Sequence, residues 1–219
     1  MDISWVGHAC FSVRTGNTSI LLDPFPASLG IRIPPNVTTP SVVTVSSAQE
    51  NHSSLQEIDG KPTILSGPGE YEVSGLHIKG LRTSLVPFGV ESEPEAWNTI
   101  FVIEAEGLTI CHLGSLNGPL TARQIEELSA PHILFVPIGG HGSLTAAGAT
   151  ELVNTVEPKI FIPMIYSQPG TKLDLEPLST FTTALALKQP EPQPRLQITK
   201  ANLPVEPEIA VLSPSATLI

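Results

Sequence analysis

Short runs of apolar and β-branched residues dominate the first half of the chain, and turn-forming residues bound each run. The runs ISWV, FSVR and SILLD, at residues 3–6, 11–14 and 19–23, are separated by Gly-His-Ala and by Thr-Gly-Asn. Runs of this length between turn signals predict strands, and Thr-Gly-Asn suits a hairpin turn. We therefore expect a small antiparallel sheet at the start of the chain.

The next part of the chain continues the strand pattern with one long interruption. Residues 24–40 are rich in proline and predict an extended surface loop. In residues 41–55, an apolar run then breaks into a polar loop of small residues, which is where many enzymes place a site. Residues 62–86 and 98–114 each predict hairpins, and the acidic segment 87–97 between them predicts an exposed loop.

The second half changes to helices that alternate with buried strands. Apolar residues at helical spacing, with Ser143 and Thr145 as cap candidates for the middle helix, are followed each time by a continuous apolar run. Hairpins followed by α/β units predict an α/β fold with two sheets packed face to face and helices outside, in a single domain over residues 1–219. The predicted segments are helices at 120–130, 143–158 and 175–188, strands at 132–138 and 159–166, and a closing strand region at 196–212.

Composition narrows the classes of partner. The formal charge is −10, and only 11 Lys and Arg residues are scattered along 219 positions, so we expect no nucleic-acid ligand. The start of the chain has no basic segment before an apolar one, and no run approaches 18 apolar residues, so we expect a cytoplasmic protein without a membrane partner. Cys10 and Cys111 are isolated, which predicts two reduced, buried thiols.

Seven segments follow one another along the chain: WVGHACFSV, ILLDP, the strand and loop at 42–52, SGPGEYEVSGLHIKG, NTIFVIEAEGLTICHLGSL, FVPIGGHGSLTAAGATELV and PKIFIPMIY. Taken in this order, they resemble the metallo-β-lactamase fold, and in particular its lactonase-like zinc-dependent hydrolases. The resemblance covers nearly the whole chain and implies a four-layer αββα sandwich with a metal site at one edge of the paired sheets. Such a site binds one or two divalent ions, zinc or manganese, that activate a bridging water.

The residues at the family's metal-ligand positions differ from the family pattern. The family has a T-H-x-H-x-D-H loop, and in this alignment Ser47, Gln49 and Asn51 replace the first His, the second His and the Asp. Only His52 matches. Neutral hydroxyl and amide oxygens are poor ligands for zinc, so this loop predicts a degenerate metal site.

The later ligand positions differ as well. The family's bridging Asp falls on Ser115, and the His of its closing P-x-H-Y pattern falls on Ile165, which cannot bind a metal. A His expected after the hairpin at residue 80 has no counterpart between 78 and 111. We therefore predict that the chain uses no metal and no other cofactor.

Four further residues are candidates for lining a remnant pocket or supporting it. His8 lies in the first turn, where the resemblance implies a supporting role, and Asp23 resembles the strand-end Asp that orients neighbouring loops. His112 and His141 lie on segments that approach the site in the family. His141 stands among glycines, which suits an anion-binding turn, although a turn that is simply tight explains the glycines better.

These observations leave more than one function open. The first hypothesis is a non-catalytic protein that acts as a binding or interaction module, with a small anionic molecule or a protein as partner. The alternative is an atypical hydrolase of a small lactone or phosphorylated substrate, which requires His8, His52, His112 and His141 to converge. A third hypothesis is a packing role in an oligomer, either with copies of itself or with an active homologue.

Overall fold

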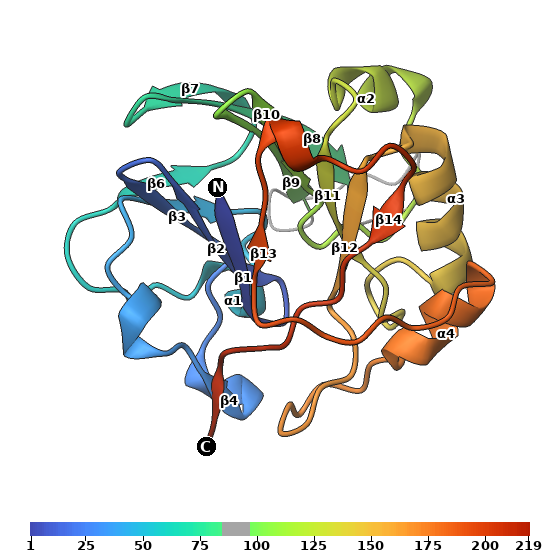
Figure 1. Cartoon of the computed structure of the whole chain (residues 1–219). Coiled ribbons are helices and arrows are strands. Elements are labelled where there is room, and N and C mark those ends of the chain that lie inside the picture. Colours follow the sequence, from blue (N-terminus) through green and yellow to red (C-terminus); the bar gives the residue numbers. More distant parts are fainter. Residues whose placement is uncertain (85–96) are drawn as a thin grey trace.

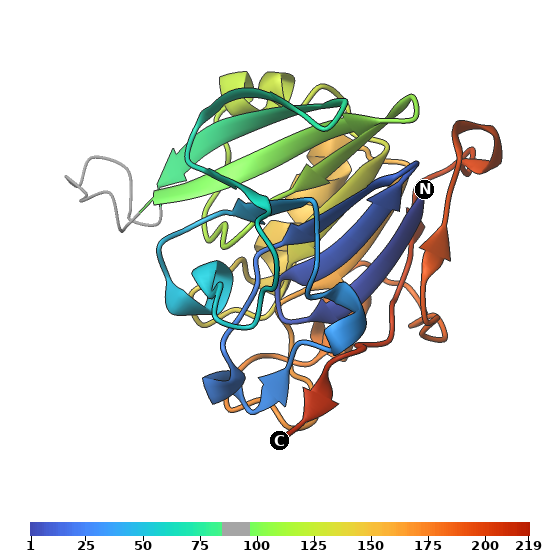
Figure 2. The same cartoon turned by 90° about the vertical axis from the view of Figure 1, so that its left-hand side faces the viewer.

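The computed structural model of the chain describes residues 1–84 and 97–219, and two sheets packed face to face form its centre (Figures 1 and 2). The predicted acidic loop at 87–97 lies outside the described residues except for its last position. Within the described ranges, no helix is both long and apolar enough to cross a lipid bilayer.

The first sheet has six strands and comes mostly from the first third of the chain. Its first three sequential strands are antiparallel, as predicted, and the strands that follow are parallel to the third. In spatial order the strands are β13 (Leu196–Gln197), β1 (Asp2–Gly7), β2 (Cys10–Thr15), β3 (Thr18–Leu22), β5 (Val42–Val45) and β6 (Thr63–Ser66).

The second sheet has seven strands and joins the predicted hairpins to the predicted α/β units. The hairpin strands are antiparallel, and the strands of the second half are parallel. In spatial order the strands are β14 (Glu208–Ile209), β12 (Ile160–Met164), β11 (Ile133–Pro137), β10 (Leu108–His112), β9 (Trp97–Ala105), β8 (Leu76–Ser84) and β7 (Gly69–Val73).

Helices lie outside the sheets, and α3 and α4 cover the seven-stranded sheet in Figure 1. Each predicted helix is present but shorter than its pattern. For α3 the side chain of Thr145 caps the first turn by accepting from the backbone N–H of Gly148, which selects one of the two predicted caps. The helices are α1 (Glu50–Ser53), α2 (Ala122–Glu127), α3 (Ala146–Val156) and α4 (Leu178–Ala184).

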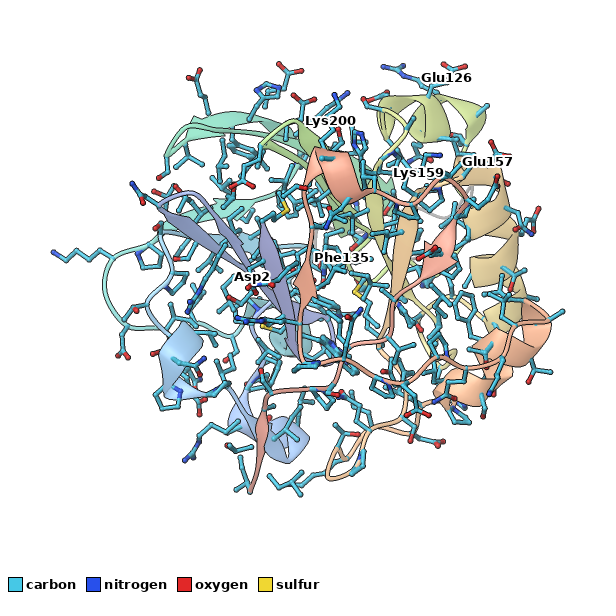
Figure 3. The ribbon with its side chains drawn as sticks, in the orientation of Figure 1. Asp2, Glu126, Phe135, Glu157, Lys159 and Lys200 are labelled. Carbon is cyan, nitrogen blue, oxygen red and sulfur yellow. The ribbon has the colours of Figure 1, made fainter. Side chains whose placement is uncertain are left out.

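The core lies between the two sheets and is built from aromatic and branched side chains. Phe11 of β2 and Phe135 of β11 are fully buried, with ring centroids 4.3 Å apart, so their contact joins the sheets. Figure 3 shows Phe135 inside the molecule, with Glu126 and Glu157 at its outside. The predicted α/β sandwich is therefore confirmed.

The prediction of an extended surface loop at 24–40 is wrong. Phe25, Leu29, Ile31 and Ile33 are buried in a second cluster on the outer face of the six-stranded sheet. Burial of these apolar side chains outweighs the preference of the prolines for an open loop. The segment carries two 3-10 turns, Ala27–Leu29 and Pro35–Val37, and the short strand β4 (Ile31–Arg32), which pairs with β15 (Thr217–Leu218).

Candidate functional site

Loops that follow the strands of both sheets meet at one edge and enclose a cavity of about 140 Å³. Because β3, β5, β10, β11 and β12 are parallel within their sheets, the loops after their carboxyl ends gather at the same edge. Seven of the predicted pocket residues line this cavity: His8, Gln49, Asn51, His52, Ser115, His141 and Ile165. The other lining residues are Gly140, Gly142, Ser143, Leu173 and Leu175.

Asp23 is a buried carboxylate that accepts several hydrogen bonds at this edge. Its Oδ1 accepts the backbone N–H of Ser46 at 2.8 Å, and its Oδ2 accepts from the Ser46 hydroxyl and from Nδ1 of His52 at 2.8 Å. Burial alone would raise the pKa of Asp23, but nearby His112 and the hydrogen bonds from His52 and Ser46 hold this pKa below its usual value. Asp23 is therefore ionised and fixes the orientation of the His52 ring.

His8 and Asn51 form a second polar pair on the cavity wall. The amide nitrogen of Asn51 lies 2.9 Å from Nε2 of His8, so the amide donates and Nε2 accepts. Burial, together with the neighbouring His52, lowers the pKa of His8 to about 3. His8 is therefore neutral at neutral pH, with its proton on Nδ1.

His112 and Ser47, the other two predicted pocket residues, lie outside the cavity lining. Both are buried, and Nε2 of His112 donates to the carbonyl of Ala9 at 2.9 Å, while its Nδ1 lies 4.0 Å from Oδ2 of Asp23. Burial lowers the pKa of His112 and Asp23 opposes that shift in part. His112 thus supports the site from behind, and the structure brings three histidines around one carboxylate.

Four non-glycine residues at this edge adopt a left-handed backbone conformation. His8, Asp23, His141 and Ile165 all have positive φ, at 51°, 43°, 45° and 53°. This region is sterically costly for residues other than glycine, and most of all for a β-branched residue such as Ile165. Three of these residues, His8, His141 and Ile165, line the cavity, and strained residues are frequent at functional sites.

Some residues that build the site are not evident from the sequence. Ser46 supplies two hydrogen bonds to Asp23, and Asn98 positions Ser115 by accepting from its backbone N–H at 2.9 Å and its hydroxyl at 3.2 Å. In the sequence, Asn98 could be noticed only as a polar residue at the start of an apolar strand segment. Leu173 and Leu175 come from a loop whose path no local pattern predicts.

Comparison with known proteins places this chain in a family. The family described as the Beta-lactamase superfamily domain matches residues 2–165. A metal-dependent hydrolase of Archaeoglobus fulgidus is 26% identical over 195 residues, which span 76% of this chain and 84% of the relative. Another from Thermoplasma acidophilum is 28% identical over 192 residues, with the same two shares. The chain belongs to the beta-lactamase superfamily.

A solved structure agrees with this assignment. The Thermotoga maritima protein named as a Zn-dependent hydrolase of the metallo-β-lactamase superfamily is 31% identical, with a TM-score of 0.78, and the match covers 96% of this chain and 97% of that one. The resemblance to the metallo-β-lactamase fold that the sequence predicts is therefore confirmed.

Our prediction that no cofactor is involved is wrong for this family, because the relatives are named as metal-dependent hydrolases. The residues of this chain nevertheless fit a metal poorly. Within residues 1–84 and 97–219, no three His, Cys, Asp or Glu side chains are grouped so that they could hold a metal ion. Asn51, which the sequence resemblance aligns with the family's Asp, is an amide that donates to His8, and the side chain of Ile165 offers no ligand atom. No metal-dependent step follows from these residues.

Proposed function

We propose that this chain uses the site of a metal-dependent hydrolase family to bind a small polar molecule without hydrolysing it. The observation that carries the proposal is the composition of the cavity wall. The lining keeps histidine and adds serine and amide side chains, but it contains no carboxylate at the positions that bind metal and activate water in the family.

The hydrogen-bonded polar side chains beside the cavity support a binding function. Asp23, His52 and Ser46 form a buried hydrogen-bonded group, and His8 pairs with Asn51 beside it. Because these buried groups hydrogen-bond to one another, their side chains are held in fixed positions. A fixed polar group beside a cavity favours a working pocket.

A hydrolase remains the second candidate, because His8 and His52 do converge, with ring centroids 5.1 Å apart. The two candidates differ in what a metal-supplied assay measures. The wild-type chain is incubated with excess Zn²⁺ or Mn²⁺ and with γ-butyrolactone or bis(p-nitrophenyl) phosphate, next to a His52→Gln variant that reports contaminating activity.

We expect the wild-type chain to turn over neither compound faster than the His52→Gln variant. Because metal is present in excess, loss of metal during purification does not explain this result. Turnover by the wild-type chain that disappears in the His52→Gln variant would replace the binding proposal with the hydrolase.

A further inference from the structure

A second recess, which we call the hairpin recess, lies at the end of the six-stranded sheet opposite the cavity. It has a volume of about 250 Å³ and is lined by the β2–β3 hairpin between residues 12 and 19 and by the segment 36–40 before β5. Asp23 follows the end of β3 at the cavity edge, whereas Thr18 begins β3 and lines the hairpin recess. A strand of 5 residues spans roughly 16 Å, so the hairpin recess is distinct from the cavity.

Arg14 contributes an unpaired positive charge to the hairpin recess. Of the other arginines in the chain, three pair with carboxylates and Arg82 lies over the ring of Trp97. Arg14 has neither kind of partner within residues 1–84 and 97–219, and its Nη2 donates to the carbonyl of Asn36, another lining residue, at 3.4 Å. Most of its N–H groups are therefore free, and a planar guanidinium matches the paired oxygens of a carboxylate or phosphate.

Ser12 is the most buried polar residue of the hairpin recess. It is 7% exposed, and its hydroxyl has no hydrogen-bond partner in the part of the chain that the structure describes. Ser19, on the neighbouring strand, accepts the backbone N–H of Ser41 at 3.2 Å and keeps its own proton for another acceptor. Asn17 and Thr39 are exposed lining residues that also carry donors. A ligand oxygen that accepts from Ser12 would offset the cost of leaving a buried hydroxyl unpaired.

None of the described residues that line the hairpin recess is Asp or Glu. Glu106 contacts the hairpin at Gly16, where its Oε1 accepts the backbone N–H at 2.8 Å, but its Oε2 pairs with the ammonium group of Met1 at 2.8 Å. Asp59 accepts from the hydroxyl of Thr38 at 3.0 Å, and neither of these two residues lines the recess. The charge of the lining itself therefore favours an anion over a cation.

We propose that the hairpin recess binds a small hydroxylated molecule through a carboxylate or phosphate group. Arg14 and Ser12 hold the oxyanion, and the side chains of Asn17 and Thr39 face the hydroxyl groups of the ligand. The volume of about 250 Å³ equals roughly that of eight liquid water molecules, which suits a short hydroxylated carbon chain with one such head group. This site does not depend on the proposed function of the cavity.

The test compares three probes that share a hydroxylated three-carbon body: glycerol 3-phosphate, glycerate and glycerol. Binding to the full chain is measured at low salt by NMR from the backbone amide signals of Gly16 and Asn17. We expect each anionic probe to shift these signals and to bind at least about tenfold more tightly than glycerol. The tighter of the two anions identifies the head group as phosphate or carboxylate.

Substitution of Arg14 tests the role of the guanidinium. Arg14→Gln should weaken binding of the tighter anion by about tenfold or more, because it removes the charged donor. Arg14→Lys should weaken binding less, because it keeps the charge and loses only the planar fork. The matched control is Arg123→Gln, which makes the same change at an exposed position outside the hairpin recess and should leave binding intact. The thermal unfolding midpoint reports whether each variant is folded.

Three results would overturn the inference. The first is glycerol binding as tightly as the anions, and the second is wild-type affinity in the Arg14→Gln variant. The third is a lack of shifts at Gly16 and Asn17 with any probe. In that case, shifts confined to the amides of Gly140 and Gly142 would assign the anion to the cavity instead.

Discussion

His8 shows how a single residue at this edge ties protonation to folding. It is 2% exposed, its Nε2 accepts from Asn51, and its Nδ1 has no partner among the described residues. Its pKa falls from 6.5 to about 3 because burial opposes the charged form. The folded protein therefore resists protonating a group that the unfolded chain protonates readily.

This difference predicts a pH dependence that belongs to His8. Between pH 6 and pH 4 the unfolded chain binds a proton at this residue and the folded chain does not, so stability is lost as the pH falls. The free energy of unfolding should lose about 1.4 kcal/mol per pH unit from this group. His8→Asn, which tolerates the positive φ, should reduce the slope by about that amount in urea denaturation at several pH values.

The same series of urea denaturation experiments shows whether this assignment of His8 is correct. Wild type and His8→Asn with parallel pH profiles would mean that His8 is protonated equally in both states and would contradict its buried, neutral assignment. Asn202→Ala, at an exposed 3-10 turn far along the chain, should shift stability without changing the slope.

The residue scale is also where sequence reasoning had its clearest limits. The positions of Gln49, Asn51, Ser115 and Ile165 around one cavity could be predicted, because they follow strands whose order the resemblance implies. The roles of Ser46 and Asn98 could not, because a hydrogen bond between residues far apart in sequence leaves no local pattern. The roles assigned to the pocket residues remain predictions.

At the scale of elements, the ends of β11 and β12 hold the cavity loops in contact. Gly139 follows β11, and a Cβ at this position would lie 2.0 Å from the carbonyl oxygen of Ile165, which follows β12. The carbonyl of Gly139 also accepts the backbone N–H of Glu176, and the backbone N–H of Ile165 donates to the carbonyl of His8. Close backbone approach here brings the two halves of the pocket together.

Gly139→Ala should therefore destabilise the chain, since backbone must move to admit the methyl group. Such overpacking costs about 1–3 kcal/mol, and the shift should appear in the denaturant midpoint and in the imidazole NMR signals of the cavity. Gly118→Ala is the matched control, because nothing lies within 4 Å of its Cβ. Equal stability of the two variants would contradict the tight contact between the strand ends.

The presence of each helix was more predictable than the residues at which it begins and ends. Every predicted helix of the second half is present, because its apolar spacing matches the face that packs on the sheet. The pattern for α4 extends to residue 188, but the helix ends at Ala184, and Ala186 has a φ of 54°. The surface-loop prediction for residues 24–40 was wrong because four apolar side chains of this segment are buried despite its high proline content.

At the scale of the whole molecule, the fold is that of its hydrolase relatives, and we propose that the chemistry of the site is not. The two sheets, their parallel strand ends and the strained turns form the cavity edge, and the match to the Thermotoga maritima structure spans nearly the full chain. The sandwich could be predicted from the order of strands and helices. The polar framework of the cavity could not, because it depends on hydrogen bonds between residues far apart in the chain, such as the one between His52 and Asp23.

The most direct test of this account is the rate of hydrolysis by a chain whose ligand positions are restored. The variant carries Ser47→His, Gln49→His, Asn51→Asp, Ser115→Asp and Ile165→His, and it is assayed beside the wild-type chain with the same excess of Zn²⁺ and the same lactone and phosphodiester. We predict hydrolysis by the restored variant and none above background by the wild-type chain. Wild-type hydrolysis that equals or exceeds that of the folded, restored variant would contradict the claim that this cavity binds without hydrolysing.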